Sequence, residues 1–95
     1  MGVSEDPVVR ELRDRITEND RAILEAVNLR VELVAELKAH KLALGYDLVD
    51  SSREGWLADH LAAANPGPLS EAGLRELVAT LIALTKREVA IGGGT

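Results

Sequence analysis

Three basic residues, Arg13, Arg30 and Lys41, occur where the helical repeat of the first half of the chain calls for apolar side chains. Counted in sevens from Val9, every step as far as residue 44 is aliphatic except Arg30. A guanidinium buried without a partner is costly, so each cation is either paired or able to bind an anion. Taken singly, each also fits the edge of an apolar face, with its stem lying along that face. Together, the three predict a binding site for a small polyanion.

The spacing of these cations limits which of them can share one pocket. Arg30 and Lys41 are 11 residues apart, which is three helical turns or roughly 16 Å along one face. Arg13 precedes Arg30 by 17 residues, or roughly 25 Å, and cannot reach the same pocket within its own chain. In an antiparallel partner, however, the equivalent arginine would lie close to this pocket.

The first helix is predicted to be unusually long. Pro7 is a favoured first-turn residue, and neither Gly nor Pro occurs again until Gly45. Those ~38 residues would span roughly 57 Å, about twice the diameter of a compact domain of this length. Because the apolar face continues almost to the end of this helix, a second chain must cover part of it. The sequence therefore predicts an intertwined homodimer.

Two shorter helices are expected to follow. The second begins with Asp50 or Ser51 as its N-cap, and Ser51 with Glu54 fits a capping box. Trp56 on this helix is expected to lie in the core. The segment "ANPGP" then interrupts the chain, and Ser70 is expected to cap the third helix.

Composition indicates an all-α fold with three helices in each chain. The 95 residues include one Trp, one Tyr and no Phe, so the core must consist of slim aliphatic side chains that suit closely packed helices. We expect residues 1–91 to form one helical domain and the Gly-rich residues 92–95 to form a flexible tail.

Several classes of partner and location are disfavoured. A net charge of −5 argues against nucleic acid. The absence of cysteine excludes disulfides and thiolate metal sites, and His40 and His60 lack companions for a metal site. No apolar run reaches the ~20 residues that span a membrane, and the first residues lack the apolar stretch of a secretory signal. We expect a soluble cytoplasmic protein without a metal.

The stretches "LRDRITENDRAILEAVNLR", "ELKAHK" and "DSSRE" resemble the all-helical chorismate mutases. That family has the pattern LRxxIxxxDxxIxxLxxxR, a lysine eleven residues after its last arginine, and D-x-x-R-E at the start of the second helix. The resemblance covers about residues 10 to 91 and needs no gap from Leu12 to Glu54. It implies an interlocked helical dimer that rearranges chorismate to prephenate, a step toward phenylalanine and tyrosine, without a cofactor.

The resemblance also implies roles for individual residues. Arg30 and the partner subunit's Arg13 would hold the two carboxylates of the substrate. Lys41 would donate a hydrogen bond to the ether oxygen of the breaking bond, and Glu54 would accept one from the ring hydroxyl. Two further residues would shape that end of the pocket: Asp50 and Arg53.

The third helix departs from the family pattern. Thr85 lies where the family has a serine near a carboxylate, but the glutamine or glutamate expected four residues later is Val89. Glu88 is one position away and is the candidate to contact the ether oxygen if the preceding turn shifts by one residue. The apolar spacing instead favours an inward Val89, so both alternatives stay open.

Other interpretations also stay open. Asp50, Ser51 and Glu54 also fit plain helix capping, which is the favoured interpretation of such a helix start taken alone. A related enzyme acting on a chorismate analogue, such as isochorismate pyruvate lyase or aminodeoxychorismate mutase, would have a similar sequence. A non-catalytic helical dimer would give no reason for Arg30. Whether a larger aromatic-pathway enzyme binds this one, as happens for small members of the family, is also left open.

Overall fold

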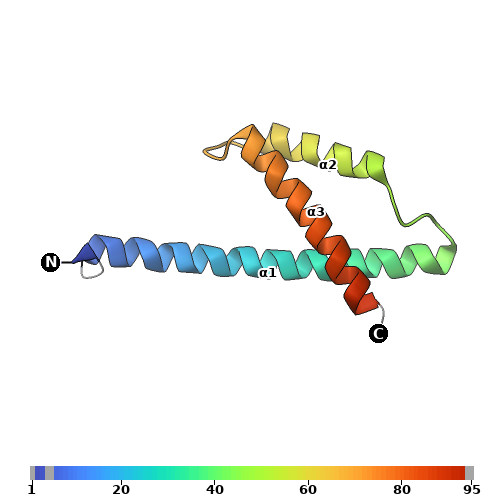
Figure 1. The fold of residues 1–95 in the computed structure, drawn as a ribbon, viewed down its shortest axis with the longest axis horizontal. Helices are drawn as coiled ribbons and strands as arrows, with labels where there is room; N and C mark the ends of the chain where they lie inside the picture. The colour runs from blue at the N-terminus through green and yellow to red at the C-terminus, as the bar shows by residue number, and fades with distance from the viewer. Residues whose placement is uncertain (1, 4–5, 94–95) are drawn as a thin grey trace. The chain divides into compact units, whose positions relative to one another are not determined.

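The computed structural model describes residues 2–3 and 6–93, and all its regular elements are helices. Helix α1 spans Pro7–Leu44, α2 spans Ser51–Ala64 and α3 spans Glu71–Gly93 (Figure 1). The predictions of an all-α chain, of three helices and of a very long first helix are confirmed. Within the described residues, no helix is both long enough and apolar enough to span a membrane.

Local signals set both ends of α1. The carboxylate oxygen Oδ1 of Asp6 accepts hydrogen bonds from the backbone N–H groups of Val8 and Val9, at 2.8 and 3.2 Å. At the other end, Gly45 has a φ of +72°, and the N–H of Tyr46 donates to the carbonyl of Lys41 at 2.9 Å. This is a Schellman ending, in which glycine adopts the left-handed conformation without a Cβ penalty.

No residue of α1 is buried in the single chain. Its leucines and isoleucines are about half exposed, including Ile16, Ile23, Leu33 and Leu37. The chain divides into two compact units, Met1–Arg30 and Val31–Thr95, and the boundary falls within α1. The first unit is therefore little more than a helix with an uncovered apolar face, and the candidate site described below belongs to the second.

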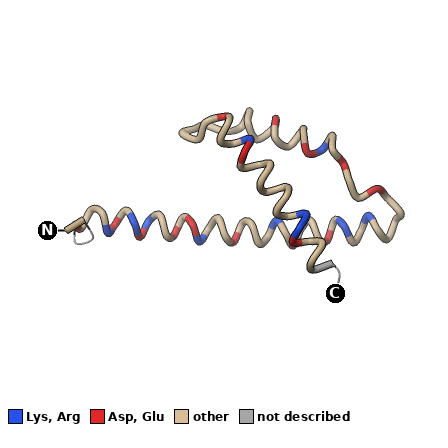
Figure 2. The backbone as a smooth tube through the Cα atoms, in the orientation of Figure 1, with Lys and Arg blue, Asp and Glu red and all other residues tan. Residues whose placement is uncertain are grey.

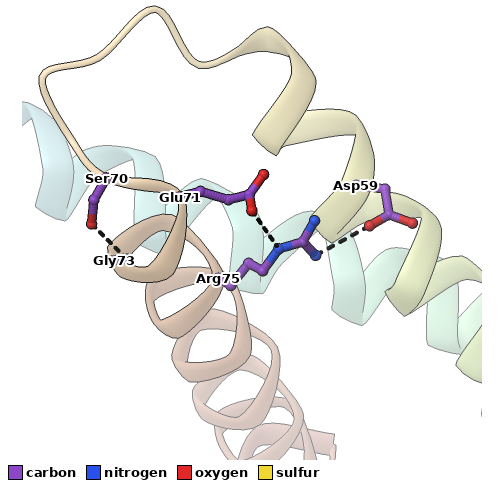
Figure 3. Close-up of polar contacts among 5 residues, drawn as sticks. All are labelled: Asp59, Ser70, Glu71, Gly73 and Arg75. Atoms are coloured by element: carbon purple, nitrogen blue, oxygen red, sulfur yellow. Dashed lines mark hydrogen bonds and ion pairs between the residues drawn. The ribbon is translucent and has the colours of Figure 1, made fainter.

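Helices α2 and α3 pack against each other within the second unit. The hydroxyl of Ser70 caps α3 by accepting a hydrogen bond from the N–H of Gly73 at 3.0 Å, as predicted. Arg75 joins the two helices, because its guanidinium lies 3.1 Å from Asp59 and 4.0 Å from Glu71 (Figure 3). These side chains are exposed, so the pairs orient the helices more than they stabilise the fold.

The buried apolar side chains described are few and all come from α3: Leu74, Val78 and Val89. The prediction that Trp56 lies in the core is wrong, because its side chain is 49% exposed on α2. Helix α3 also runs two residues into the segment expected to be a flexible tail and ends at Gly93. The rest of that tail lies outside the described residues.

Candidate active site

An apolar groove with a basic rim lies between the last turns of α1 and the end of α3. It has a volume of about 190 Å³, and three of its lining residues are lysines: Lys38, Lys41 and Lys86. The other lining residues are aliphatic: Val34, Leu37, Leu48, Val49 and Val89. We call this the lysine groove. Every residue that lines it belongs to the unit Val31–Thr95.

The charge of the lysine groove contrasts with that of the rest of the chain. The protein carries a net charge of −5, and acidic and basic residues are interspersed along α1 (Figure 2). Lysine side chains around an aliphatic floor suit a small ligand that is anionic and has an apolar face. Lys38 and Lys41 lie on one face because they are three residues apart on α1.

Glu54 forms an ion pair with Lys86, which joins the first turn of α2 to α3. The Glu54 side chain is 33% exposed and that of Lys86 is 55% exposed. A second, more open groove lies between α2 and α3, and both members of the pair line it. Because Lys86 lines both grooves, it connects Glu54 to the rim that carries Lys41.

Asp50 is the N-cap of α2, which supports the capping interpretation of this residue. Its Oδ1 accepts hydrogen bonds from the Ser52 hydroxyl at 2.7 Å and from the Arg53 N–H at 3.0 Å. The Ser52 hydroxyl and the Arg53 N–H lower the pKa of Asp50; burial opposes them, and the positive charge of Lys41 lowers the pKa by less than burial raises it. Asp50 is therefore a carboxylate at neutral pH.

Arg53 lies over an aromatic stack rather than against a carboxylate. Its guanidinium carbon is 4.2 Å from the centre of the Trp56 ring. Trp56 in turn stacks on His60, with ring centres 4.5 Å apart and an angle of 11° between the rings. A cation–π contact therefore fixes the direction of the Arg53 side chain on the exposed surface of α2.

The α3 candidates differ sharply in exposure. Val89 is only 5% exposed and lines the lysine groove, whereas Glu88 is exposed and is not among the described lining residues. In the single chain, the groove wall at this point is therefore aliphatic. Thr85 is 2% exposed, and its hydroxyl donates a 2.6 Å hydrogen bond to the Leu81 carbonyl, one turn earlier. Binding a carboxylate through this hydroxyl would require it to give up that bond.

Arg13 and Arg30 both belong to the unit Met1–Arg30. Arg13 is exposed and Arg30 is half-buried. Within that unit, they lie on one continuous helix, as predicted.

The sequence of the chain matches the model of one protein family, chorismate mutase type II, over residues 12–89. The chain belongs to the chorismate mutase type II family. This membership confirms the resemblance drawn from the sequence motifs and the prediction of an isomerase that acts on chorismate.

A solved structure of a chorismate mutase (form II) from Thermus thermophilus has the same fold, with a TM-score of 0.82. Its sequence is 27% identical, and the match covers 86% of this chain and 93% of the Thermus chain. No curated protein sequence is similar enough to count as a match. Family membership therefore rests on the family model and on the likeness of fold.

The sequence of this chorismate mutase did not point to two lysines of the groove, Lys38 and Lys86. Lys38 could have been found from its position, because it lies three residues before Lys41 on the same face of α1. Lys86 gave no such signal, because its place depends on how α3 packs. Within the described residues, no group of three or more His, Cys, Asp or Glu side chains could hold a metal ion.

Proposed function

We propose that this chorismate mutase binds chorismate in the lysine groove and rearranges it there to prephenate. The observation that carries the proposal is the basic rim of Lys38, Lys41 and Lys86 around an aliphatic floor in an acidic chain. The substrate carries two carboxylates on a compact hydrocarbon frame, so it matches both the rim and the floor.

The reaction needs neither a nucleophile nor a general base. A pericyclic rearrangement breaks one C–O bond while a C–C bond forms, so the protein has to hold a compact conformer of the substrate. It must also stabilise the negative charge that grows on the ether oxygen. We assign this second task to the ammonium group of Lys41, which lines the groove.

The remaining roles are carried over from the family pattern. Arg30 and the partner subunit's Arg13 bind the two carboxylates, and Glu54 accepts a hydrogen bond from the ring hydroxyl. Asp50 and Arg53 shape the same end of the pocket. Thr85 is proposed to lie near a carboxylate, and Glu88 to contact the ether oxygen. For these last two the single chain offers less support, because the Thr85 hydroxyl bonds within α3 and Glu88 is exposed.

We also propose that the active form is an intertwined homodimer in the cytoplasm. The apolar face of α1 supports this assembly, since its leucines and isoleucines are exposed in the single chain and a run of exposed apolar side chains marks an interface. In a shared site, Arg13 could bind the substrate of the partner subunit, although it is too far along α1 to reach the pocket of its own chain. The absence of cysteine suits a reducing compartment. A larger aromatic-pathway enzyme would be a second kind of partner.

The assembly can be checked directly. Light scattering at micromolar concentration is expected to give twice the mass of one chain, because a lone α1 would leave its leucines in water. A folded monomer under these conditions would contradict the shared site.

The activity is tested by mixing purified protein with chorismate, following the loss of its absorbance and identifying the product. Prephenate is the expected product. Release of pyruvate, or no reaction with chorismate and turnover of an amino analogue, would assign the chain to a different reaction.

A further inference from the structure

The Glu54–Lys86 ion pair places a positive charge beside the carboxylate that is proposed to contact the substrate ring. The pair involves Oε1 of Glu54 and Nζ of Lys86. The Glu54 side chain is half-buried, whereas that of Lys86 is exposed, so solvent screens the pair mainly at its lysine end. The roles carried over from the family give no reason for this lysine.

The other cation that lines the groove between α2 and α3 is already engaged. Arg75 lines the same groove between α2 and α3, but its guanidinium pairs with Asp59 and Glu71. Among the described residues that line this groove, Lys86 is thus the cation that offsets the charge of Glu54. The pair as a whole is close to neutral.

An unpaired carboxylate would attract a ring ammonium strongly, as well as accept a hydrogen bond from a ring hydroxyl. With Lys86 in place, a ring ammonium meets a carboxylate that is already neutralised, and a like charge next to it. A hydroxyl has no charge to be repelled, and it can donate to Oε2 while Oε1 holds the lysine. The ion pair therefore penalises the cationic substituent selectively.

We infer that Lys86 is a specificity-determining residue that makes the site favour a ring hydroxyl over a ring ammonium. The inference rests on the proposed function, which places the ring substituent of chorismate at Glu54. It concerns the choice between chorismate and its amino analogue, two substrates whose enzymes share the same sequence pattern.

The test uses Lys86→Met, which removes the charge and keeps the length of the side chain. We measure kcat/KM for chorismate and the inhibition constant of aminodeoxychorismate, which is defined even without turnover. In Lys86→Met, the amino compound is expected to gain about fivefold relative to chorismate, the upper end for one partly exposed charge pair. Lys86→Arg should keep the preference of the wild type.

Two more variants separate specificity from structure. Arg87→Met removes a neighbouring exposed charge on α3 and should leave the preference unchanged. Glu54→Gln keeps the charge of Lys86 but removes the carboxylate. The preference for chorismate over aminodeoxychorismate should therefore increase in this variant, opposite to the change in Lys86→Met.

Equal losses for both compounds in Lys86→Met would show a merely structural lysine and overturn the inference. An unchanged preference in both Lys86→Met and Glu54→Gln would also overturn it, even if chorismate is a good substrate. Failure of the wild type to act on chorismate would instead overturn the proposed function, and this inference with it.

Discussion

Lys41→Ala and Arg30→Ala variants are expected to convert chorismate about a hundredfold more slowly than the wild type, or more slowly still. Each substitution removes a positive charge that is proposed to act on the substrate, and for Lys41 the loss should appear mainly in kcat, because its charge is assigned to the ether oxygen of the transition state. Steady-state kinetics with chorismate measure the effect. Neither variant should unfold, because neither residue is buried in the core.

Arg21→Ala is the matched control. Arg21 lies nine residues before Arg30 on α1, half a turn away around the helix, and pairs with Glu18 at 2.7 Å on the exposed surface. Its loss should leave turnover near that of the wild type. If Lys41→Ala and Arg30→Ala retain activity and only lower the melting temperature, these residues are edge positions of an apolar face and the proposed site is wrong.

Mixing two inactive variants is expected to restore activity. Arg13→Ala and Arg30→Ala homodimers should each be nearly inactive. In a mixed dimer, one site combines the intact Arg13 of one chain with the intact Arg30 of the other. Refolding an equal mixture gives about half mixed dimers by random pairing, each with one complete site out of two. Activity should return to roughly a quarter of that of the wild type.

The control for this experiment is each variant refolded alone under the same conditions. Circular dichroism and light scattering confirm that the mixture has refolded as dimers. If it has, and no activity returns, Arg13 acts within its own chain or has only a structural part. The intertwined site would then have to be abandoned.

Helix boundaries could be predicted because the signals that set them act over a few residues. Pro7 and Gly45 mark the two ends of α1 through their backbone conformations, and Ser70 caps α3 through a single hydrogen bond. Periodicity likewise placed Lys41 on a face shared with leucines and valines. The structure finds it on the rim of an apolar groove.

Contacts between helices could not be predicted in the same way. Periodicity gives the face of a residue but not the partner opposite it, so the pairing of Glu54 with Lys86 was not foreseen. Trp56 was expected in the core. Instead, the Trp56 ring contacts the Arg53 guanidinium and stacks on the His60 ring, and its side chain stays about half exposed.

The position of Trp56 makes the intrinsic tryptophan fluorescence of the protein sensitive to this part of α2. Trp56 is the one tryptophan of the chain, and indole emission depends on the charges around the ring. Arg53, which lies over the ring, is also proposed to shape the end of the pocket that receives the substrate ring. Ligand binding that moves this guanidinium would change the fluorescence of the unlabelled enzyme, so occupancy could be followed in stopped flow apart from chemistry.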